Sequence, residues 1–221
     1  MRVIVALLIG LIAAATIVSL IGPTIDLEIT RLFFDPVTGR FPAVSHPILK
    51  MLRDHGYVSI ITSAGFVIAA LATKFLPRLR LNVPGRVAIF LVGSLALGPG
   101  LLVNLVFKDH WHRPRPSQVI EFGGDKAYVN WWNPGGECGH NCSFASGEAA
   151  AAAWMFGPAM LVPPPWRAAA MGAAAIFAVT TGLSRMAMGA HFLTDVLFGA
   201  LISLLVLWGM YALMFHRLRQ K

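Results

Sequence analysis

The sequence predicts an all-α membrane protein that crosses a bilayer six times. Of its 221 residues, 57% are hydrophobic and 13% are charged, against roughly 25% charged in soluble domains. A helix needs about 20 apolar residues to span a bilayer, and a lone strand would leave backbone groups unpaired in lipid. Six stretches contain no Asp, Glu, Lys or Arg: residues 3–25, 55–73, 87–107, 149–166, 168–184 and 196–216. We expect six helical spans in a single domain, residues 1–221.

The first stretch has some features of a secretory signal peptide. Arg2 precedes it, and the small residues 13–15 lie within it. It is longer than the apolar core of a signal peptide, which has about 7–15 residues, so an uncleaved span is favoured. In the loop that follows, Pro47 precedes apolar residues with helical spacing, Ile48, Met51 and Leu52. This pattern predicts a short interfacial helix.

Among the later stretches, residues 168–184 are short for a span, so their ends are open. The orientation follows from the basic residues, which are enriched on the cytoplasmic side of membrane proteins. The termini and short connectors carry nine Lys and Arg and no acid, and the longer loops carry the other nine and all ten acids. The short connectors have the higher density of basic residues, so we expect both termini in the cytoplasm and the long loops, with the interfacial helix, in the periplasm.

Three cations lie at the predicted outer ends of spans: Lys108, Arg115 and Arg185. Together they suit a phosphoryl dianion. Ser146-Gly147 opens the predicted fourth helix, where backbone N–H groups and the helix dipole favour an anion. Any one of these basic residues could equally serve topology alone. Their number on one face favours a phosphate site.

His191 and Asp195 are four residues apart, so on a helix they would share a face. A carboxylate there can orient an imidazole and stabilise its cationic form. A histidine so placed can attack phosphorus. The alternatives are a structural histidine and an aspartate that only starts a helix. The joint pattern with the cations favours a nucleophile and its partner.

These residues fall into long-spaced motifs. The segments are K-x6-R-P at Lys108, Arg115 and Pro116, A-S-G-E at residues 145–148, and S-R-x5-H-x3-D at Ser184, Arg185, His191 and Asp195. The chain resembles the type 2 phosphatidic acid phosphatase superfamily, whose members have six spans and a P-S-G-H second motif. The resemblance implies a phosphatase that uses no metal and no cofactor. It implies His191 as nucleophile, Asp195 as its partner, and phosphate binding by Lys108, Arg115, Ser146, Gly147 and Arg185.

Glu148 departs from this family, in which a histidine at that position protonates the leaving group. An unperturbed glutamate titrates near ~4.3, and nearby cations would lower its pKa further, whereas a bound phosphate would raise it. Glu148 is one candidate for the acid. The others are histidines of the preceding loop, His110, His112 and His140. The S-F-x-S-G-E segment resembles some bacterial branches, including enzymes that act on lipid A.

Cys138 and Cys142 lie four residues apart on the outer loop, with His140 between them. In an oxidising periplasm we expect a disulfide rather than a metal site or free thiols. Two thiols and one histidine are too few for a closed structural zinc site.

The sequence therefore predicts a bacterial inner-membrane lipid phosphatase with a periplasmic active site. Candidate substrates are lipid A, phosphatidylglycerophosphate, undecaprenyl diphosphate and phosphatidic acid, and lipid A is favoured by the glutamate variant. One alternative is a phosphotransferase that passes the phosphoryl group to a second lipid. Another is a non-catalytic lipid-binding or transport protein with a degenerate site. The partners expected are the lipid phosphate and membrane lipids, with no nucleic acid, because the 18 basic residues form no stripe. The oligomeric state is left open.

Overall fold

The computed structural model describes residues 2–22, 24–51, 65 and 84–215. Within these ranges the chain is mostly helical and contains no β-strand, which confirms the all-α prediction. Four helices in this part of the chain are long and apolar enough to cross a membrane: Val3–Ile21, Gly85–His110, Arg167–Ala187 and Leu193–Phe215. They correspond to the predicted first, third, fifth and sixth spans. The predicted second span, residues 55–73, lies outside the described residues.

The first span ends earlier than the sequence predicts. Helix α1 (Arg2–Ile21) stops because Gly22 has a φ of 92°, a conformation that glycine adopts readily. A separate short helix, α2 (Thr24–Arg31), follows and carries Asp26 in its first turn. The prediction of one helix to residue 25 was wrong, and the break buries Asp26 at the end of the bundle.

The third span consists of three consecutive helical segments. Helix α4 (Gly85–Leu95) continues as the π-helix η3 (Ala96–Phe107) and ends in α5 (Lys108–His110). Pro99 lies inside η3, and the Asn104 side-chain amide donates to the Pro99 carbonyl at 2.8 Å. This contact satisfies a carbonyl in the widened segment. The span places Lys108 at its C-terminal end.

The predicted fourth span is shorter than expected and is interrupted. It comprises α6 (Gly147–Trp154) and α7 (Phe156–Leu161), which are separated at Met155. Val162 is extended and precedes Pro163, and a residue before proline avoids the helical region. The helix therefore ends at Leu161, and the prediction that it continues to residue 166 was wrong.

The last two helices are longer than their charge-free stretches. Helix α8 (Arg167–Ala187) extends past both predicted ends, and helix α9 (Leu193–Phe215) begins three residues before its predicted start. Helix α9 packs against α1, α4, η3 and α6, and α8 packs against α6 and α7. The core between them includes the buried side chains of Phe90, Trp154 and Leu207. The Trp154 indole donates to Ser94 Oγ at 2.9 Å, so its buried N–H is satisfied.

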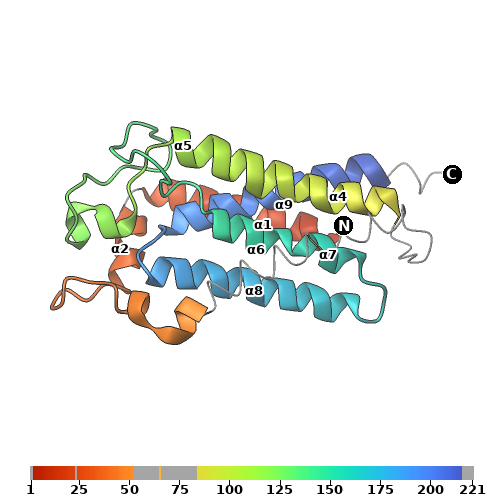
Figure 1. The fold of residues 1–221 in the computed structure, drawn as a ribbon, viewed down its shortest axis with the longest axis horizontal. Coiled ribbons are helices and arrows are strands. Elements are labelled where there is room, and N and C mark those ends of the chain that lie inside the picture. Colours follow the sequence, from red (N-terminus) through yellow and green to blue (C-terminus); the bar gives the residue numbers. More distant parts are fainter. Residues whose placement is uncertain (1, 23, 52–64, 66–83, 216–221) are drawn as a thin grey trace.

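One end of the bundle gathers segments that are far apart in sequence. The ends of α5 and α8, the starts of α6 and α9, and α2 all lie at this end (Figure 1). The backbone N–H of Ser146 donates to the Asp195 carbonyl at 3.0 Å, which ties the starts of α6 and α9 together. The starts of α1, α4 and α8 lie at the opposite end (Figure 1). Alternating helix directions thus bring the predicted motifs together.

The predicted interfacial helix is partly described. Residues 47–51 are helical, and Ile48 and Met51 expose about half of their surface, 57% and 51%. A 3-10 helix, η1 (Pro42–Ser45), precedes them. Leu52 and the residues after it lie outside the described ranges.

Membrane orientation can be tested with single cysteines at the two ends of the bundle. Val37 is 92% exposed at the end with α2, and Trp166 is 70% exposed at the opposite end. A membrane-impermeant maleimide applied to intact spheroplasts should label Val37→Cys and not Trp166→Cys, which should react only after lysis. The reverse pattern would show that both termini and the site are inverted relative to the prediction.

Candidate active site

His191 is fully buried in the turn that precedes α9. Its Nδ1 lies 2.8 Å from the Ser143 carbonyl, and its Nε2 lies 3.2 Å from Glu148 Oε2. The carbonyl can only accept, so Nδ1 carries a hydrogen and Nε2 is the nitrogen directed to the cation cluster. We expected His191 and Asp195 on one helical face. The shared helical face was wrong, because α9 begins at Leu193 and His191 lies before it. The two side chains nevertheless lie close together, with Asp195 Oδ2 3.8 Å from Nδ1.

Both oxygens of the Asp195 carboxylate are occupied by closer donors. Oδ1 accepts from Arg113 Nη1 at 2.5 Å. Oδ2 accepts from the Ser143 hydroxyl at 2.5 Å and from the Phe192 backbone N–H at 2.8 Å. Ser143 therefore contacts Asp195 through its hydroxyl and His191 through its carbonyl. In this arrangement Asp195 orients His191 through Ser143 as well as by its own charge.

Arg113 is a fully buried cation that the sequence analysis did not single out. Its guanidinium bridges Asp195 and Asp26, donating from Nη2 to Asp26 Oδ2 at 2.7 Å. It also donates to Thr194 Oγ1 and to the Val129 carbonyl, each at 2.8 Å. Burial alone would lower the pKa of Arg113, but the two carboxylates raise it overall, so the guanidinium stays charged.

The sequence contains few signals that predict the network of Arg113, Asp26 and Asp195. Arg113 lies two residues before Arg115 in a run of basic residues and prolines, and only Arg115 matches the motif. Asp26 is the first acid after the first charge-free stretch, which was a readable signal. Their pairing across 87 residues depends on the tertiary fold.

Lys108 and Arg115 are brought together by Asn141. The Lys108 ammonium donates to Asn141 Oδ1 at 3.2 Å, and Arg115 Nη2 donates to the Asn141 carbonyl and Oδ1, both at 2.9 Å. Asn141 has a φ of 51° and lies between Cys138 and Cys142, which form a disulfide. The disulfide closes the turn that presents Asn141, a residue that sequence reasoning missed.

Arg185 and Glu148 complete the cluster around His191. Arg185 Nη2 lies 3.1 Å from Glu148 Oε1. Glu148 Oε2 also contacts His191 Nε2, and the charges of Arg185 and Lys108 act on the same carboxylate. Within the described part of the chain, Arg185 Nε is a buried donor without a hydrogen-bond partner. Such a donor suits a phosphate oxygen.

Ser146 and Gly147 form the start of α6, as predicted. Ser146 is fully buried and caps the helix, because its hydroxyl accepts from the Ala149 backbone N–H at 3.3 Å. A Cβ at Gly147 would lie 2.5 Å from Asn104 Oδ1, so this position needs glycine. The start of α6, which includes Glu148, therefore packs directly against η3.

The loop histidines are not brought to the nucleophile by the contacts described. His110 Nδ1 lies 2.9 Å from the Val106 carbonyl, and His112 Nδ1 lies 2.9 Å from the Cys138 carbonyl. His140 is exposed. The described residues contain no group of three or more His, Cys, Asp or Glu side chains that could hold a metal ion. Glu148 is the side chain at His191 Nε2 that could serve as a general acid.

A bundle of membrane-length helices with a buried histidine and a cation cluster at one end is the arrangement expected of an integral membrane protein whose site suits a phosphate group. The chain belongs to the PAP2 superfamily, whose sequence profile matches residues 87–219. This range contains each of the motif residues in the cluster. Membership of this family supports the assignment of the chain as a membrane lipid phosphatase.

Individual relatives and a solved structure give a more specific comparison than the family does. The lipid A 4'-phosphatase of Francisella tularensis subsp. novicida is 32% identical over 216 residues, covering 96% of each chain. The lipid A 4'-phosphatase of Rhizobium etli is 43% identical over 130 residues, covering 59% of this chain and 51% of the relative. A solved PAP2-type phosphatidylglycerolphosphate phosphatase from Bacillus subtilis has a TM-score of 0.59 at 18% identity, covering 96% of each chain. This last likeness shows the fold alone.

The Arg113 network can be tested by stability. Arg113→Met leaves two buried carboxylates without their partner, which costs on the order of 3–5 kcal/mol. The matched control is Arg31→Met, because Arg31 pairs with Glu28 on the surface, where a pair contributes about 0–1 kcal/mol. The thermal unfolding midpoint in detergent should fall strongly for Arg113→Met and little for Arg31→Met.

If Arg113→Met does not accumulate, Asp26→Asn provides the second measurement, because it removes one of the two carboxylates. Its midpoint should also fall. Equal midpoints for the buried and the surface variants would contradict the structural role assigned to Arg113.

Proposed function

We propose that the protein removes a phosphate from lipid A at the periplasmic face of the inner membrane, through a phosphohistidine on His191. The observation that carries the proposal is the contact of His191 Nε2 with Glu148, at 3.2 Å, within a cluster of three cations. The relatives named as lipid A 4'-phosphatases support the choice of substrate. The acyl chains would stay in the bilayer while the phosphate enters the outer end of the bundle.

The cationic side chains and the start of α6 would bind the phosphate. Arg185 offers its unpartnered buried Nε, and Lys108 and Arg115 are oriented toward each other through Asn141. Ser146 and Gly147 add the positive end of a helix dipole. These groups would stabilise the charge on the three equatorial oxygens as phosphorus changes its bonding.

Proton transfer would involve His191 and Glu148 together. In the ligand-free protein both ring nitrogens of His191 face acceptors, a pattern that a doubly protonated ring satisfies. A bound phosphate dianion disfavours a negative charge on Glu148. The Nε2 proton therefore passes to Glu148, which leaves the Nε2 lone pair free to attack phosphorus.

The first chemical step forms the Nε2–P bond and breaks the bond from phosphorus to the lipid oxygen. Glu148 gives its proton to that oxygen, so the lipid leaves as an alcohol. In the second step Glu148 takes a proton from water, the water oxygen bonds to phosphorus, and the Nε2–P bond breaks. Inorganic phosphate leaves, and Glu148 returns the proton to His191.

The decisive experiment is phosphate release by purified protein from a panel of lipid phosphates, with a second lipid present as a possible acceptor. Lipid A should be hydrolysed, and His191→Ala should abolish turnover without unfolding the protein. His46→Ala, which changes an exposed histidine, is the control. Asp195→Asn should cost less than His191→Ala but still be large.

Three results would change the proposal. Wild-type rates in His191→Ala would exclude the phosphohistidine. Transfer of phosphate to the second lipid without release would favour the phosphotransferase. Binding of lipid phosphates with no reaction at all would favour a non-catalytic lipid-binding protein.

Glu148 can be tested by two opposite substitutions. Glu148→Gln should lower kcat by about 100- to 10,000-fold, because it cannot carry the proton. Glu148→His should retain activity, since a histidine can accept and donate the same proton. Glu148 must carry a proton when the lipid oxygen leaves, and a higher pH disfavours that protonated form. The kcat of the wild type should therefore fall on the alkaline side.

The control for Glu148 is Glu137→Gln, an exposed glutamate of the outer loop, which should leave kcat unchanged. Near-wild-type kcat in Glu148→Gln would remove the acid role. His140→Ala, His110→Ala and His112→Ala would then identify the acid.

A separate prediction is that the activity does not require a metal ion. Phosphate is bound here by cationic side chains and a helix start, so activity should survive an excess of a chelator. Vanadate should inhibit, because it adopts the trigonal-bipyramidal geometry of the transferring phosphoryl group. Loss of activity in chelator that a divalent ion restores would contradict this mechanism.

A further inference from the structure

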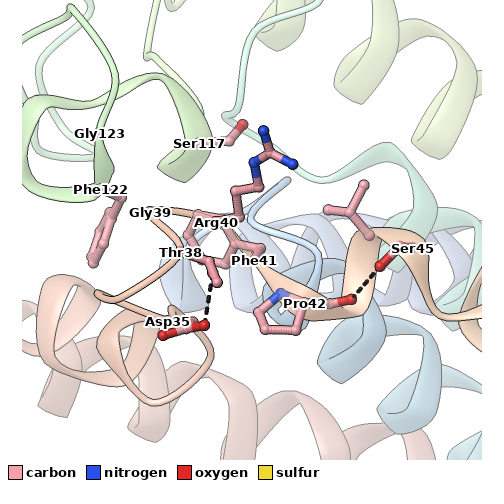
Figure 2. Close-up of a pocket in the computed structure, with 11 residues that line it drawn as sticks. Asp35, Thr38, Gly39, Arg40, Phe41, Pro42, Ser45, Ser117, Phe122 and Gly123 are labelled. Carbon is pink, nitrogen blue, oxygen red and sulfur yellow. Dashed lines mark hydrogen bonds between the residues drawn. The ribbon is translucent and has the colours of Figure 1, made fainter.

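A hollow, the outer basin, opens at the same end of the bundle as the candidate active site. It has a volume of about 600 Å³, within the range of small-molecule sites, roughly 300–1,000 Å³. Its wall includes residues 38–42, Ser117 and Phe122 (Figure 2). The polar partners described for His191 and Glu148 do not include any of these residues.

The outer basin and the candidate active site share a wall. A Cβ at Gly189 would lie 2.4 Å from the Phe41 ring, so this ring packs directly on the turn that leads to His191. The Ser117 backbone N–H donates to the Gly189 carbonyl at 3.0 Å. Phe41 also belongs to one buried cluster with Phe192, the residue after His191.

The segment around residue 116 connects the cation cluster to the outer basin. Arg115 belongs to the cation cluster, and Ser117 lines the outer basin. Two residues span at most about 7 Å. A headgroup whose phosphate is bound by Arg115 therefore needs to extend only this far along the chain to reach the Ser117 side of the outer basin.

The polar groups of the outer basin suit a sugar that carries an anion. Arg40 is exposed, and in the part of the chain described no side chain pairs with its guanidinium. This guanidinium points away from Asp35, which lies on the opposite wall (Figure 2). The Asp35 carboxylate is engaged by the Thr38 hydroxyl at 2.7 Å and by the Val37 backbone N–H at 2.9 Å. Arg40 and the Ser117 hydroxyl thus form a side of the outer basin suited to an anion.

We propose that the outer basin binds the part of a glycolipid headgroup that is not hydrolysed, with Arg40 pairing to a second anionic group on the sugar. The inference rests on the proposed function, because it assumes that the substrate is a glycolipid phosphate. A fork of guanidinium donors recognises a phosphate or a carboxylate by two parallel hydrogen bonds. Arg40 is therefore a specificity residue rather than a catalytic one.

The test compares two glycolipids that differ only in the second phosphate. Each is titrated into detergent-solubilised His191→Ala protein, in which no turnover occurs, and binding is followed by thermal stabilisation. The bisphosphate should half-saturate at a concentration about ten-fold below that of the monophosphate, as expected for a charged hydrogen-bonded pair. Adding Arg40→Gln should bring the ratio of the two concentrations to near one, and Ser117→Ala should reduce it less.

Arg31→Gln is the matched control, since Arg31 is an exposed arginine of the same end that pairs with Glu28, and it should leave the ratio unchanged. A ratio near one before Arg40 is changed, or the same ratio after Arg40→Gln, overturns the inference. Neither outcome depends on turnover. If the ratio behaves as expected while the wild type releases no phosphate from either glycolipid, the outer basin is supported and the proposed reaction fails.

Discussion

The site depends on one buried interaction, the Arg113 guanidinium between Asp26 and Asp195. An isolated charge this deeply buried would be very costly, and either carboxylate alone would be costly as well. Each group is stable only because the others are present. The three residues come from the outer loop, α2 and α9, so their pairing fixes these elements relative to one another. Asp195 then places Ser143, and Ser143 places His191.

The cluster around His191 differs from the Arg113 network, because not all of its charged groups have hydrogen-bond partners. Asp195 is saturated with donors, whereas Arg185 keeps a buried Nε without a partner in the described structure. Glu148 contacts both His191 and Arg185 in the ligand-free state. A phosphate that enters would replace Glu148 as the partner of the cations. In the proposed reaction this exchange would release the carboxylate for proton transfer.

The sequence predicted the spans and the motif residues because both are coded locally or by fixed spacing. A long apolar run must be helical in lipid, and alternating helix directions bring Lys108, Arg185 and His191 to one end. Helix ends at Gly22 and Pro163 were also readable, although the charge-free stretches ran past them. The Asp26–Arg113 pair and the bridging role of Asn141 were not readable, since they depend on which loops meet. His191 lies before the helix rather than on it, and spacing alone could not show this.

The cation cluster and the outer basin place different demands on the chain. In the proposed reaction, groups that contact the phosphate would have to be held rigidly, and the residues of the cluster are buried, capped or paired on helix ends. A group that reads the rest of a headgroup needs only to be within reach, so an exposed residue such as Arg40 on a loop is sufficient. The contact of Phe41 with the turn at Gly189 keeps the cation cluster and the outer basin adjacent. Exposed loop residues beside Phe41, such as Arg40, could therefore change and alter the preferred lipid, while Phe41 keeps its contact with the turn before His191.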